Sequence, residues 1–375
     1  MRNWGDMIYL DYAATSPVYP AVLERMNSVS RDFYANPSSL YTTGFEARNI
    51  LHESRSQIAA SIHAQNDEIV FTSGGTEGNN LALFGVLHAN TKKKHIIVGA
   101  TEHHSVLAAA HALVKEGASL TILPCDAAGR YQPDDIARAI RADTALVSLH
   151  LANNETGVLQ PISEIGAITR AHRVPLHCDA VAAYGHVPID VHALKIDLLT
   201  TSAHKFGGPR GIGFLFVRNE IPIIPLFFGG QQERGLRPGT ENIPAIAGLS
   251  KALECASLPA DSTARTLLES RLMQLLPTAR VNGGSAERLP HILSLTIPGM
   301  PSERLLPRLS RLGIYLSARA ACAGGERNPS HVLLAMGLSE ADAGATIRFS
   351  TGFDTKLSEI EEAVNAIDFV IKQEK

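Results

Sequence analysis

A single lysine follows an apolar run near the middle of the chain, where a buried strand would end. Residues 197–217 form an apolar run, then His204 and Lys205, then glycines, then a second apolar run. A lysine in this position is either a solvated turn residue or an amine held in a cleft to form an imine with a carbonyl compound. Both interpretations stay open until the neighbouring strand ends are considered.

A glycine-rich turn follows an earlier apolar run, at residues 72–78. Such a turn before a helix is either simply tight or a cradle in which free backbone N–H groups bind a phosphate. The chain has neither the Walker A pattern nor the GxGxxG dinucleotide fingerprint. The pattern therefore indicates neither a nucleoside triphosphate nor a dinucleotide as the ligand.

Asp179 closes a third apolar run, and Lys205 follows it 26 residues later, about one strand-helix-strand step along the chain. A strand-end aspartate either caps a helix or holds a proton on a heteroaromatic nitrogen. A phosphate cradle, an aspartate and a lysine at neighbouring strand ends are what pyridoxal 5'-phosphate (PLP) requires. We therefore expect PLP as the cofactor.

Strand patterns alternate with helical patterns between residues 66 and 217, which is typical of an α/β fold. This alternation predicts a large doubly wound, mainly parallel sheet, with ligands bound outside the carboxyl ends of its strands. The expected strands are 68–71, 95–99, 120–123, 145–150, 175–179, 197–201 and 212–217, and the expected helices are 77–88, 105–115, 133–140 and 162–172.

The C-terminal part has a different pattern. A helical pattern ends at about Cys255, turn-forming residues follow at 257–260, and two helices are then mixed with strands at 294–297 and 346–350. We predict a large PLP-binding domain of residues 16–256 and a smaller α+β domain of residues 1–15 and 257–375.

Composition excludes several classes of function. The net charge is -3, and the chain has no long basic run and no apolar stretch of membrane-spanning length, so we expect a cytoplasmic protein that binds neither nucleic acid directly nor a membrane. The four cysteines are too far apart for a zinc site or a disulfide framework, and no metal site is expected. Three of them, Cys125, Cys178 and Cys255, are predicted to be small buried apolar residues.

Short motifs follow one another along nearly the whole chain. They are residues 9–15 (YLDYAAT), 36–39 (NPSS), 71–77 (FTSGGTE), 101–103 (TEH), 153–157 (NNETG), 177–180 (HCDA), 202–205 (SAHK), 232–242 (QERGLRPGTEN) and 347–350 (IRFS). In this order they resemble the motifs of the group I cysteine desulfurases, the NifS/IscS type, within the aminotransferase class V family of fold-type I PLP enzymes.

This resemblance implies roles for the matching residues. Lys205 would hold PLP as an imine and later move the α-proton, and Asp179 would keep the ring nitrogen protonated. His103 would stack on the ring and take part in proton transfer, and Asn154 would lie near the ring hydroxyl and the substrate. Arg348, otherwise a strand-end arginine in a surface ion pair, would bind the substrate carboxylate. The phosphate would be held by Gly75, Thr76, Ser202 and His204, and by Thr240 from the other subunit of a homodimer.

Cys322 lies in a small-residue, glycine-containing segment before a helix expected near Ser330, so we expect an accessible thiol. In the resembling family the corresponding cysteine takes the sulfur of L-cysteine as a persulfide and leaves L-alanine. The seven-residue spacing from Cys322 to Pro329 matches the group I pattern. The sulfur then passes to an acceptor: an iron–sulfur scaffold, a tRNA-thiolation protein or a DNA-sulfur-modification protein.

The chain departs from the family pattern at two places. Arg319 and Ala320 stand where the family usually has glycine and serine, and Ala182 stands where it commonly has a glutamine that hydrogen-bonds the ring hydroxyl. Two alternatives therefore stay open beside the desulfurase. One is another class V activity, such as a selenocysteine lyase, β-lyase or transaminase, and the other is a weakly active homologue that acts as a scaffold in a sulfur-transfer complex.

Overall fold

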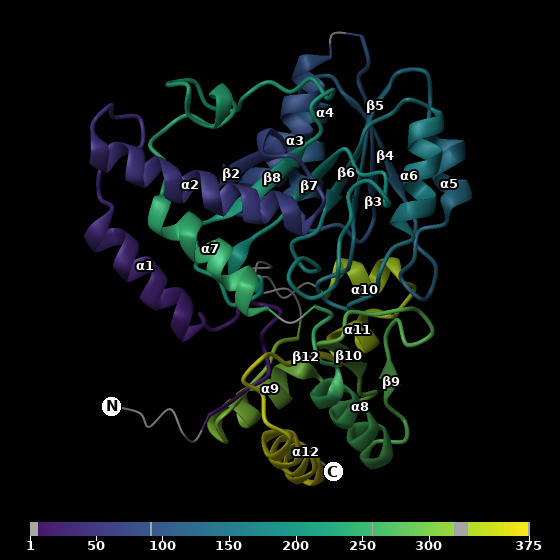
Figure 1. Cartoon of the computed structure of the whole chain (residues 1–375). Helices are drawn as coiled ribbons and strands as arrows, with labels where there is room; N and C mark the ends of the chain where they lie inside the picture. Colours follow the sequence, from purple (N-terminus) through teal and green to yellow (C-terminus); the bar gives the residue numbers. More distant parts are fainter. Residues whose placement is uncertain (1–6, 91, 257, 319–328, 374–375) are drawn as a thin grey trace.

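The computed structural model describes residues 7–90, 92–256, 258–318 and 329–373, which form a larger and a smaller unit packed together (Figure 1). The larger unit is built on a seven-stranded sheet and the smaller one on a three-stranded sheet. A separate parallel pairing joins β1 (Ile8–Tyr9) to β11 (Ile314–Tyr315). The N-terminal segment therefore runs along the smaller unit before the chain enters the larger one.

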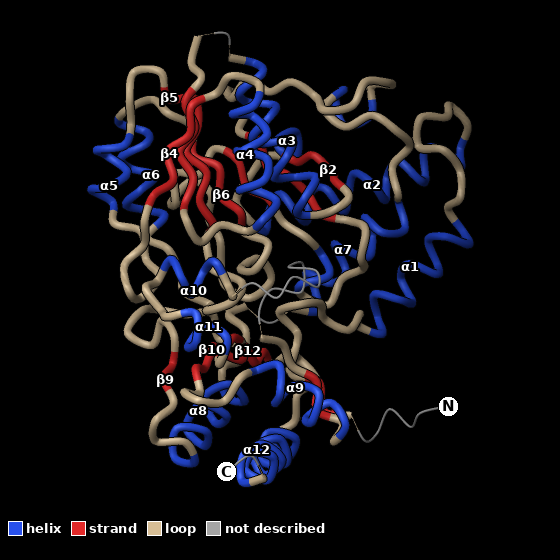
Figure 2. The backbone as a smooth tube through the Cα atoms, turned by 180° about the vertical axis from the view of Figure 1, so that it is seen from behind, coloured by secondary structure: helices blue, strands red, loops and turns tan. Residues whose placement is uncertain are grey.

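The large sheet is mainly parallel, as the sequence predicts. Its strand order is β2-β8-β7-β6-β5-β3-β4, and β8 runs antiparallel to both of its neighbours. Helices cover both faces (Figure 2), which is why strands such as β3 and β5 are buried at every position. The strands are β2 (Ile69–Thr72), β3 (His95–Gly99), β4 (Ser119–Leu123), β5 (Thr144–His150), β6 (Leu176–Asp179), β7 (Leu198–Thr200) and β8 (Gly213–Val217).

Alternate side chains of a strand enter different cores on the two faces of the sheet. Ile96 and Val98 belong to the core formed with α3 and α4, whereas Ile97 belongs to the core that α2, α5, α6 and α7 share. The sequence of a strand that is buried on both faces is therefore a continuous apolar run. These helices are α2 (Thr42–Ser61), α3 (Gly75–Ala89), α4 (His104–Lys115), α5 (Pro133–Ala139), α6 (Ile162–Ala171) and α7 (Ile243–Cys255).

The helix α1 (Pro20–Asp32) packs against α7, as does α2, and the sequence patterns indicated neither α1 nor α2. In α1 the buried side chains are Val22 and Val29, so its apolar stripe is narrow. Pro20 in the first turn marks its start, where a missing N–H costs no hydrogen bond.

The smaller unit combines an antiparallel sheet, in the order β12-β10-β9, with helices that share one core with it. Two helices and a further one near Ser330 were expected after residue 257; the described residues there form five, and α10 begins where the one near Ser330 was expected. The two short ones, of five residues each, begin after the serine caps Ser330 and Ser339 and are too short to show a helical period. The elements are α8 (Thr263–Leu275), β9 (Arg280–Val281), β10 (Ile292–Thr296), α9 (Ser302–Arg311), α10 (His331–Ala335), α11 (Glu340–Gly344), β12 (Thr346–Ser350) and α12 (Leu357–Lys372).

The other predicted elements are present, with ends that differ by one or two residues. The division into domains at residue 257 stays a prediction. Cys178 is buried as expected, but Cys125 and Cys255 are partly exposed, which corrects the expectation for these two. Across the described ranges no helix has both the length and the apolar character needed to cross a bilayer.

The long segment between β8 and α7 is fixed by a buried ion pair. The Glu233 carboxylate accepts hydrogen bonds from Arg55 Nη2 (2.5 Å) and Nη1 (2.8 Å) and from the backbone N–H of Phe71 (2.8 Å). The Arg55 guanidinium also lies over the Phe71 ring, 4.6 Å from its centre. Helix α2, strand β2 and this segment are thereby held together.

We predict that Glu233→Ala lowers the free energy of unfolding by about 3 kcal/mol, because it leaves the partly buried Arg55 guanidinium without its counter-charge and the buried Phe71 N–H without its acceptor. The control is Glu254→Ala, which removes an exposed partner of Lys251 and is expected to cost less than about 1 kcal/mol. Urea denaturation of both variants measures the difference. Equal losses for the two variants would show that the Arg55–Glu233 pair stabilises the fold no more than an exposed ion pair does.

Candidate active site

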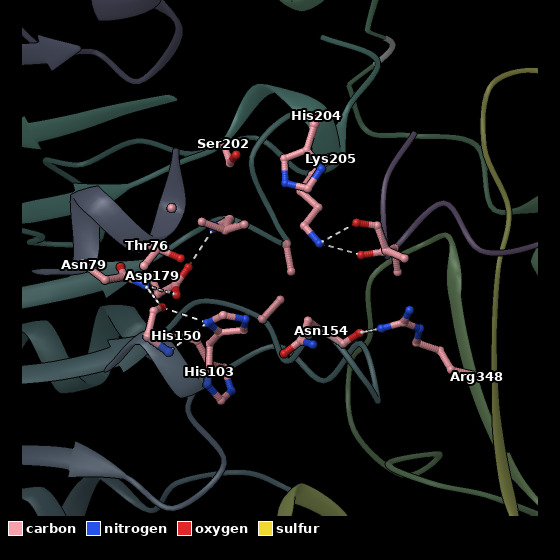
Figure 3. Close-up of a pocket in the computed structure, with 17 residues that line it drawn as sticks. Thr76, Asn79, His103, His150, Asn154, Asp179, Ser202, His204, Lys205 and Arg348 are labelled. Carbon is pink, nitrogen blue, oxygen red and sulfur yellow. Dashed lines mark hydrogen bonds between the residues drawn. The ribbon is translucent and has the colours of Figure 1, made fainter. Parts of the chain in front are cut away.

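A pocket opens at the carboxyl edge of the large sheet, where β5, β6 and β7 end (Figure 3). Asp179 and Arg348 lie on opposite sides of this pocket, and the Lys205 side chain reaches between them (Figure 3). The structure brings together here the predicted site residues Gly75, Thr76, His103, Asn154, Asp179, Ser202, His204, Lys205 and Arg348.

Lys205 ends a short 3₁₀ turn, Ala203–Lys205, directly after β7. Its ammonium group donates hydrogen bonds to the carbonyl oxygens of Ala13 (2.7 Å) and Ala14 (3.0 Å) in the N-terminal segment. The lysine is therefore no solvated turn residue. Its amine is held at the pocket, where a carbonyl compound could reach it.

The Asp179 carboxylate lies at the end of β6 and is 5% exposed. One oxygen accepts a hydrogen bond from the backbone N–H of Val181 (2.9 Å) and the other from Asn79 Nδ2 (2.7 Å). A carboxylate has about four acceptor positions, so this one can accept a further N–H from a ligand. Asn79 also donates to the Ser105 hydroxyl (2.8 Å). Asn79 lies one helical turn after Gly75, and no sequence pattern marked it as a site residue.

The start of α3 forms an open cradle beside Asp179. Gly74 caps the helix with φ +145°, a conformation that side chains rarely adopt. A Cβ atom at Gly75 would come within 2.7 Å of a Val181 methyl group, so a larger residue would narrow this cradle. Arg210, which the sequence analysis did not single out, lines the groove here and adds a positive charge. The N–H groups of the first helical turn and this cation favour an anion.

His204 lies at the same cradle, and its Nδ1 atom is 3.2 Å from the Thr15 hydroxyl. Burial, together with the nearby charges of Lys205 and Arg210, lowers the pKa of this imidazole to about 4. His204 is therefore neutral near pH 7 and can offer an anion a hydrogen bond but no charge.

His103 caps the N-terminus of α4, where its Nδ1 atom accepts a hydrogen bond from the backbone N–H of Ser105 (3.1 Å). The Ser105 hydroxyl lies 2.7 Å from the same nitrogen. In the neutral ring the proton therefore sits on Nε2. These contacts, and through Ser105 the link to Asn79, fix the plane of the ring.

Arg348 comes from β12 of the smaller unit and is 1% exposed, so it is no surface arginine. Its Nη1 donates to the backbone oxygen of Asn154 (3.0 Å) and its Nη2 to Asp11 Oδ1 (2.8 Å). Nε is buried without a hydrogen-bond partner. The guanidinium thus keeps donor capacity for an incoming carboxylate.

One described residue among those expected at the site, Thr240, does not line this pocket. It is exposed in the segment before α7. Cys322 lies outside the described residues, as do the departures Arg319 and Ala320; Ala182, the third departure, does line the pocket. Among the described residues, no three potential metal ligands lie close enough to form a metal site.

Buried hydrogen bonds hold the ends of three adjacent strands in register. His177, just before Cys178 and Asp179 in β6, bonds the Ser148 hydroxyl of β5 through Nδ1 (2.7 Å) and the Thr200 hydroxyl of β7 through Nε2 (2.9 Å). Burial lowers the pKa of His177 to about 4. The folded protein thus holds this imidazole in its neutral form.

His177 makes the folded state sensitive to acid. The unfolded state binds a proton near pH 6.5 and the folded state near pH 4, so this contribution to stability is complete above pH 6.5 and lost as the pH falls toward 4. The full loss amounts to about 3 kcal/mol. We predict that His177→Gln lowers the number of protons taken up on unfolding between pH 4 and pH 6.5 by up to one. The free energy of unfolding, measured by urea denaturation at several pH values, then depends less steeply on pH. The exposed His172→Gln is the control, and an unchanged slope in His177→Gln would contradict the prediction.

Comparison with known proteins agrees with the arrangement of this site. Residues 8–363 match the family described as aminotransferase class-V. A protein named cysteine desulfurase IscS, from Dictyoglomus turgidum, is 40% identical over 373 residues, which cover 98% of this chain and 95% of the relative. A solved structure described as a NifS-like protein has a TM-score of 0.92 at 34% identity, covering 98% of this chain and all of that one.

A second solved structure, described as SspA in complex with cysteine, has a TM-score of 0.84 at 36% identity and covers 92% of this chain and 98% of that one. These matches extend over nearly the whole chain and include both units of the fold. The chain belongs to the aminotransferase class-V family.

Proposed function

We propose that this protein is a PLP-dependent cysteine desulfurase, which converts L-cysteine to L-alanine and passes the sulfur through Cys322 to an acceptor protein. The observation that supports this most strongly is the convergence of Lys205, Asp179 and the start of α3 on one pocket. Relatives named cysteine desulfurase and a similar structure in complex with cysteine point to the same substrate.

The residues of the pocket fit PLP. An amine, a carboxylate with spare acceptor positions and a helix start open to anions are the partners needed by its aldehyde, its ring nitrogen and its phosphate. Lys205, Asp179 and His103 would hold the aldehyde and the ring, and Asn154 would lie near the ring hydroxyl. The phosphate would contact Gly75, Thr76, Ser202 and His204. When bound, PLP supplies an electron sink that makes the Cα proton of an amino acid acidic.

The remaining steps belong to side chains of this chain. Arg348 and Asn154 bind the substrate carboxylate, and the Lys205 amine moves the α-proton. His103, whose plane is fixed by Ser105, assists in proton transfer with the proton on Nε2. The carbonyl oxygens of Ala13 and Ala14 keep the lysine amine within the pocket.

The sulfur-transfer step requires a thiolate. Cys322 attacks the sulfur of L-cysteine; the bond between that sulfur and the substrate Cβ breaks, and its electron pair goes to the carbon, which is protonated. The products are L-alanine and a Cys322 persulfide, so atoms and electrons balance without an added oxidant. The persulfide sulfur then passes to a thiol of the acceptor, for which we propose an iron–sulfur scaffold, a tRNA-thiolation protein or a DNA-sulfur-modification protein of the cytoplasm.

The active form is proposed to be a homodimer, with Thr240 completing the phosphate site of the other subunit. Large apolar side chains are exposed near the segment that carries Thr240: Phe228 is 85% exposed and Phe227 55%. Tyr34 and Leu40, between α1 and α2, are exposed to 83% and 84%. Exposed apolar side chains of this size are typical of a surface that another protein covers.

The dimer proposal predicts that Phe228→Glu shifts the protein toward a monomer in light scattering, because a charge would have to be buried in the interface. We expect the same variant to lose affinity for PLP, since the partner's Thr240 would no longer reach the phosphate. The exposed Phe369→Glu, on α12, is the control. A dimeric Phe228→Glu with normal affinity for PLP would contradict this model of the interface.

The proposed activity is tested by adding L-cysteine to purified protein, with and without dithiothreitol, and measuring alanine and sulfide. With dithiothreitol we expect equal amounts of both from the wild type, without it alanine but little sulfide because the sulfur stays on Cys322, and neither product above background from Lys205→Ala or Cys322→Ala. The buried Cys178→Ser is a control for a thiol outside the chemistry. A fully active Cys322→Ala would favour a lyase or transaminase, as would pyruvate as the product. Bound PLP without turnover would favour the scaffold role.

A further inference from the structure

Arg348 is held by a carboxylate that takes no part in the proposed reaction. The Asp11 carboxylate accepts a hydrogen bond from Arg348 Nη2 through one oxygen (2.8 Å) and from the Ser317 hydroxyl through the other (2.7 Å). Arg348 and Ser317 are also paired through their backbones, with Arg348 N–H donating to the Ser317 oxygen (2.6 Å). The three residues form one connected cluster from three separate parts of the chain.

We propose that Asp11 is a positioning residue for substrate recognition, which holds the Arg348 guanidinium in the orientation that the substrate carboxylate requires. The inference rests on the proposed function, because it takes Arg348 as the group that binds this carboxylate. Arg348 lines the pocket and Asp11 does not. Asp11 therefore acts on the substrate only through the arginine.

Asp11 is itself immobile enough for this role. Its backbone is bridged to Ser350 at the end of β12, two positions after Arg348 in the same strand. The Ser350 N–H donates to the backbone oxygen of Leu10 (2.8 Å), and the Tyr9 hydroxyl donates to the backbone oxygen of Asp11 (3.1 Å). A rigid carboxylate of this kind removes rotamer freedom from the arginine before a ligand arrives, so that less binding free energy is lost on ordering it.

The contact with Asp11 leaves room for a second anion. A guanidinium has about five N–H donors, and Asp11 and the Asn154 carbonyl each use one nitrogen of it. Nη1 and Nη2 each carry a second N–H beyond these two contacts, and these remain for an incoming carboxylate. The pairing with Asp11 thus orients the cation and does not use up its donors.

The test compares two probes that differ only in the carboxylate, L-alanine and ethylamine. Their equilibrium binding to the PLP-loaded enzyme is followed by the absorbance of the cofactor, and the affinity ratio of the two probes isolates carboxylate recognition. We expect Arg348→Ala to abolish the preference for L-alanine. Asp11→Ala is expected to reduce the ratio about tenfold, equivalent to about 1.4 kcal/mol, with PLP affinity unchanged. The KM for L-cysteine should rise while kcat stays close to the wild-type value.

Two matched variants separate orientation from charge. Asp11→Asn can keep both contacts, with its amide oxygen accepting from Arg348 and its NH₂ group donating to Ser317, so we expect a ratio within about threefold of the wild type. Ser317→Ala leaves the Asp11–Arg348 contact in place and should have a similarly small effect. If Asp11→Ala does not fold or loses PLP, Asp11→Ser replaces it, because a serine side chain is also too short to reach Arg348.

The outcomes distinguish this inference from the proposed function. If Asp11→Ala and Asp11→Asn both bind L-alanine more tightly than the wild type, Asp11 is a competing anion, and the inference is overturned. An unchanged ratio in Asp11→Ala, with the ratio lost in Arg348→Ala, overturns the inference alone. An unchanged ratio in Arg348→Ala overturns it together with the proposed role of Arg348. If the ratios behave as expected but L-cysteine gives no alanine, the desulfurase proposal alone fails.

Discussion

The organisation of the pocket depends on how one short N-terminal segment holds two cations. Residues 11–14 lie between the two units of the fold, where the carbonyl oxygens of Ala13 and Ala14 bind the Lys205 ammonium and the Asp11 carboxylate binds the Arg348 guanidinium. Lys205 lies in the turn that follows β7 of the large sheet, and Arg348 lies in β12 of the small sheet. The segment therefore sets the separation of the two groups, although it supplies no reactive group of its own.

The segment is held in turn by both units. Ser350 at the end of β12 donates its backbone N–H to Leu10, and its hydroxyl accepts from the Ala13 N–H (2.8 Å). On the other side the Ser16 N–H donates to the His204 oxygen (2.8 Å), next to Lys205. A shift of the smaller unit relative to the larger one would break these contacts. The distance between lysine and arginine is thus tied to the packing of the whole chain.

Much of this arrangement could be predicted from the sequence. The alternation of apolar runs and helical periods predicted the large parallel sheet, since strands buried on both faces leave a strong signal, and polar residues at strand ends predicted Lys205 and Asp179. Asn79 and Asp11 were missed as partners because a hydrogen bond between distant segments has no local pattern. The short helix α11 was missed because five residues do not show a period, whereas a helix near Ser330, where α10 begins, was expected. Cys322 lies outside the described residues, so its predicted role rests on the sequence.

The reversed direction of β8 has a consequence for the lysine. Parallel neighbours in a sheet are usually joined by a crossover helix, whereas antiparallel neighbours need none, and residues 201–212 join β7 to β8 with only the short 3₁₀ turn that carries Lys205. Because β8 runs opposite to β7, the chain re-enters the sheet soon after Lys205, and the Thr201 N–H donates to the Phe214 oxygen (3.0 Å) across this link. Both ends of the link that carries the lysine are therefore anchored in strands that are buried at every position. Local fraying, which frees many surface loops at little cost, would here require opening the sheet itself.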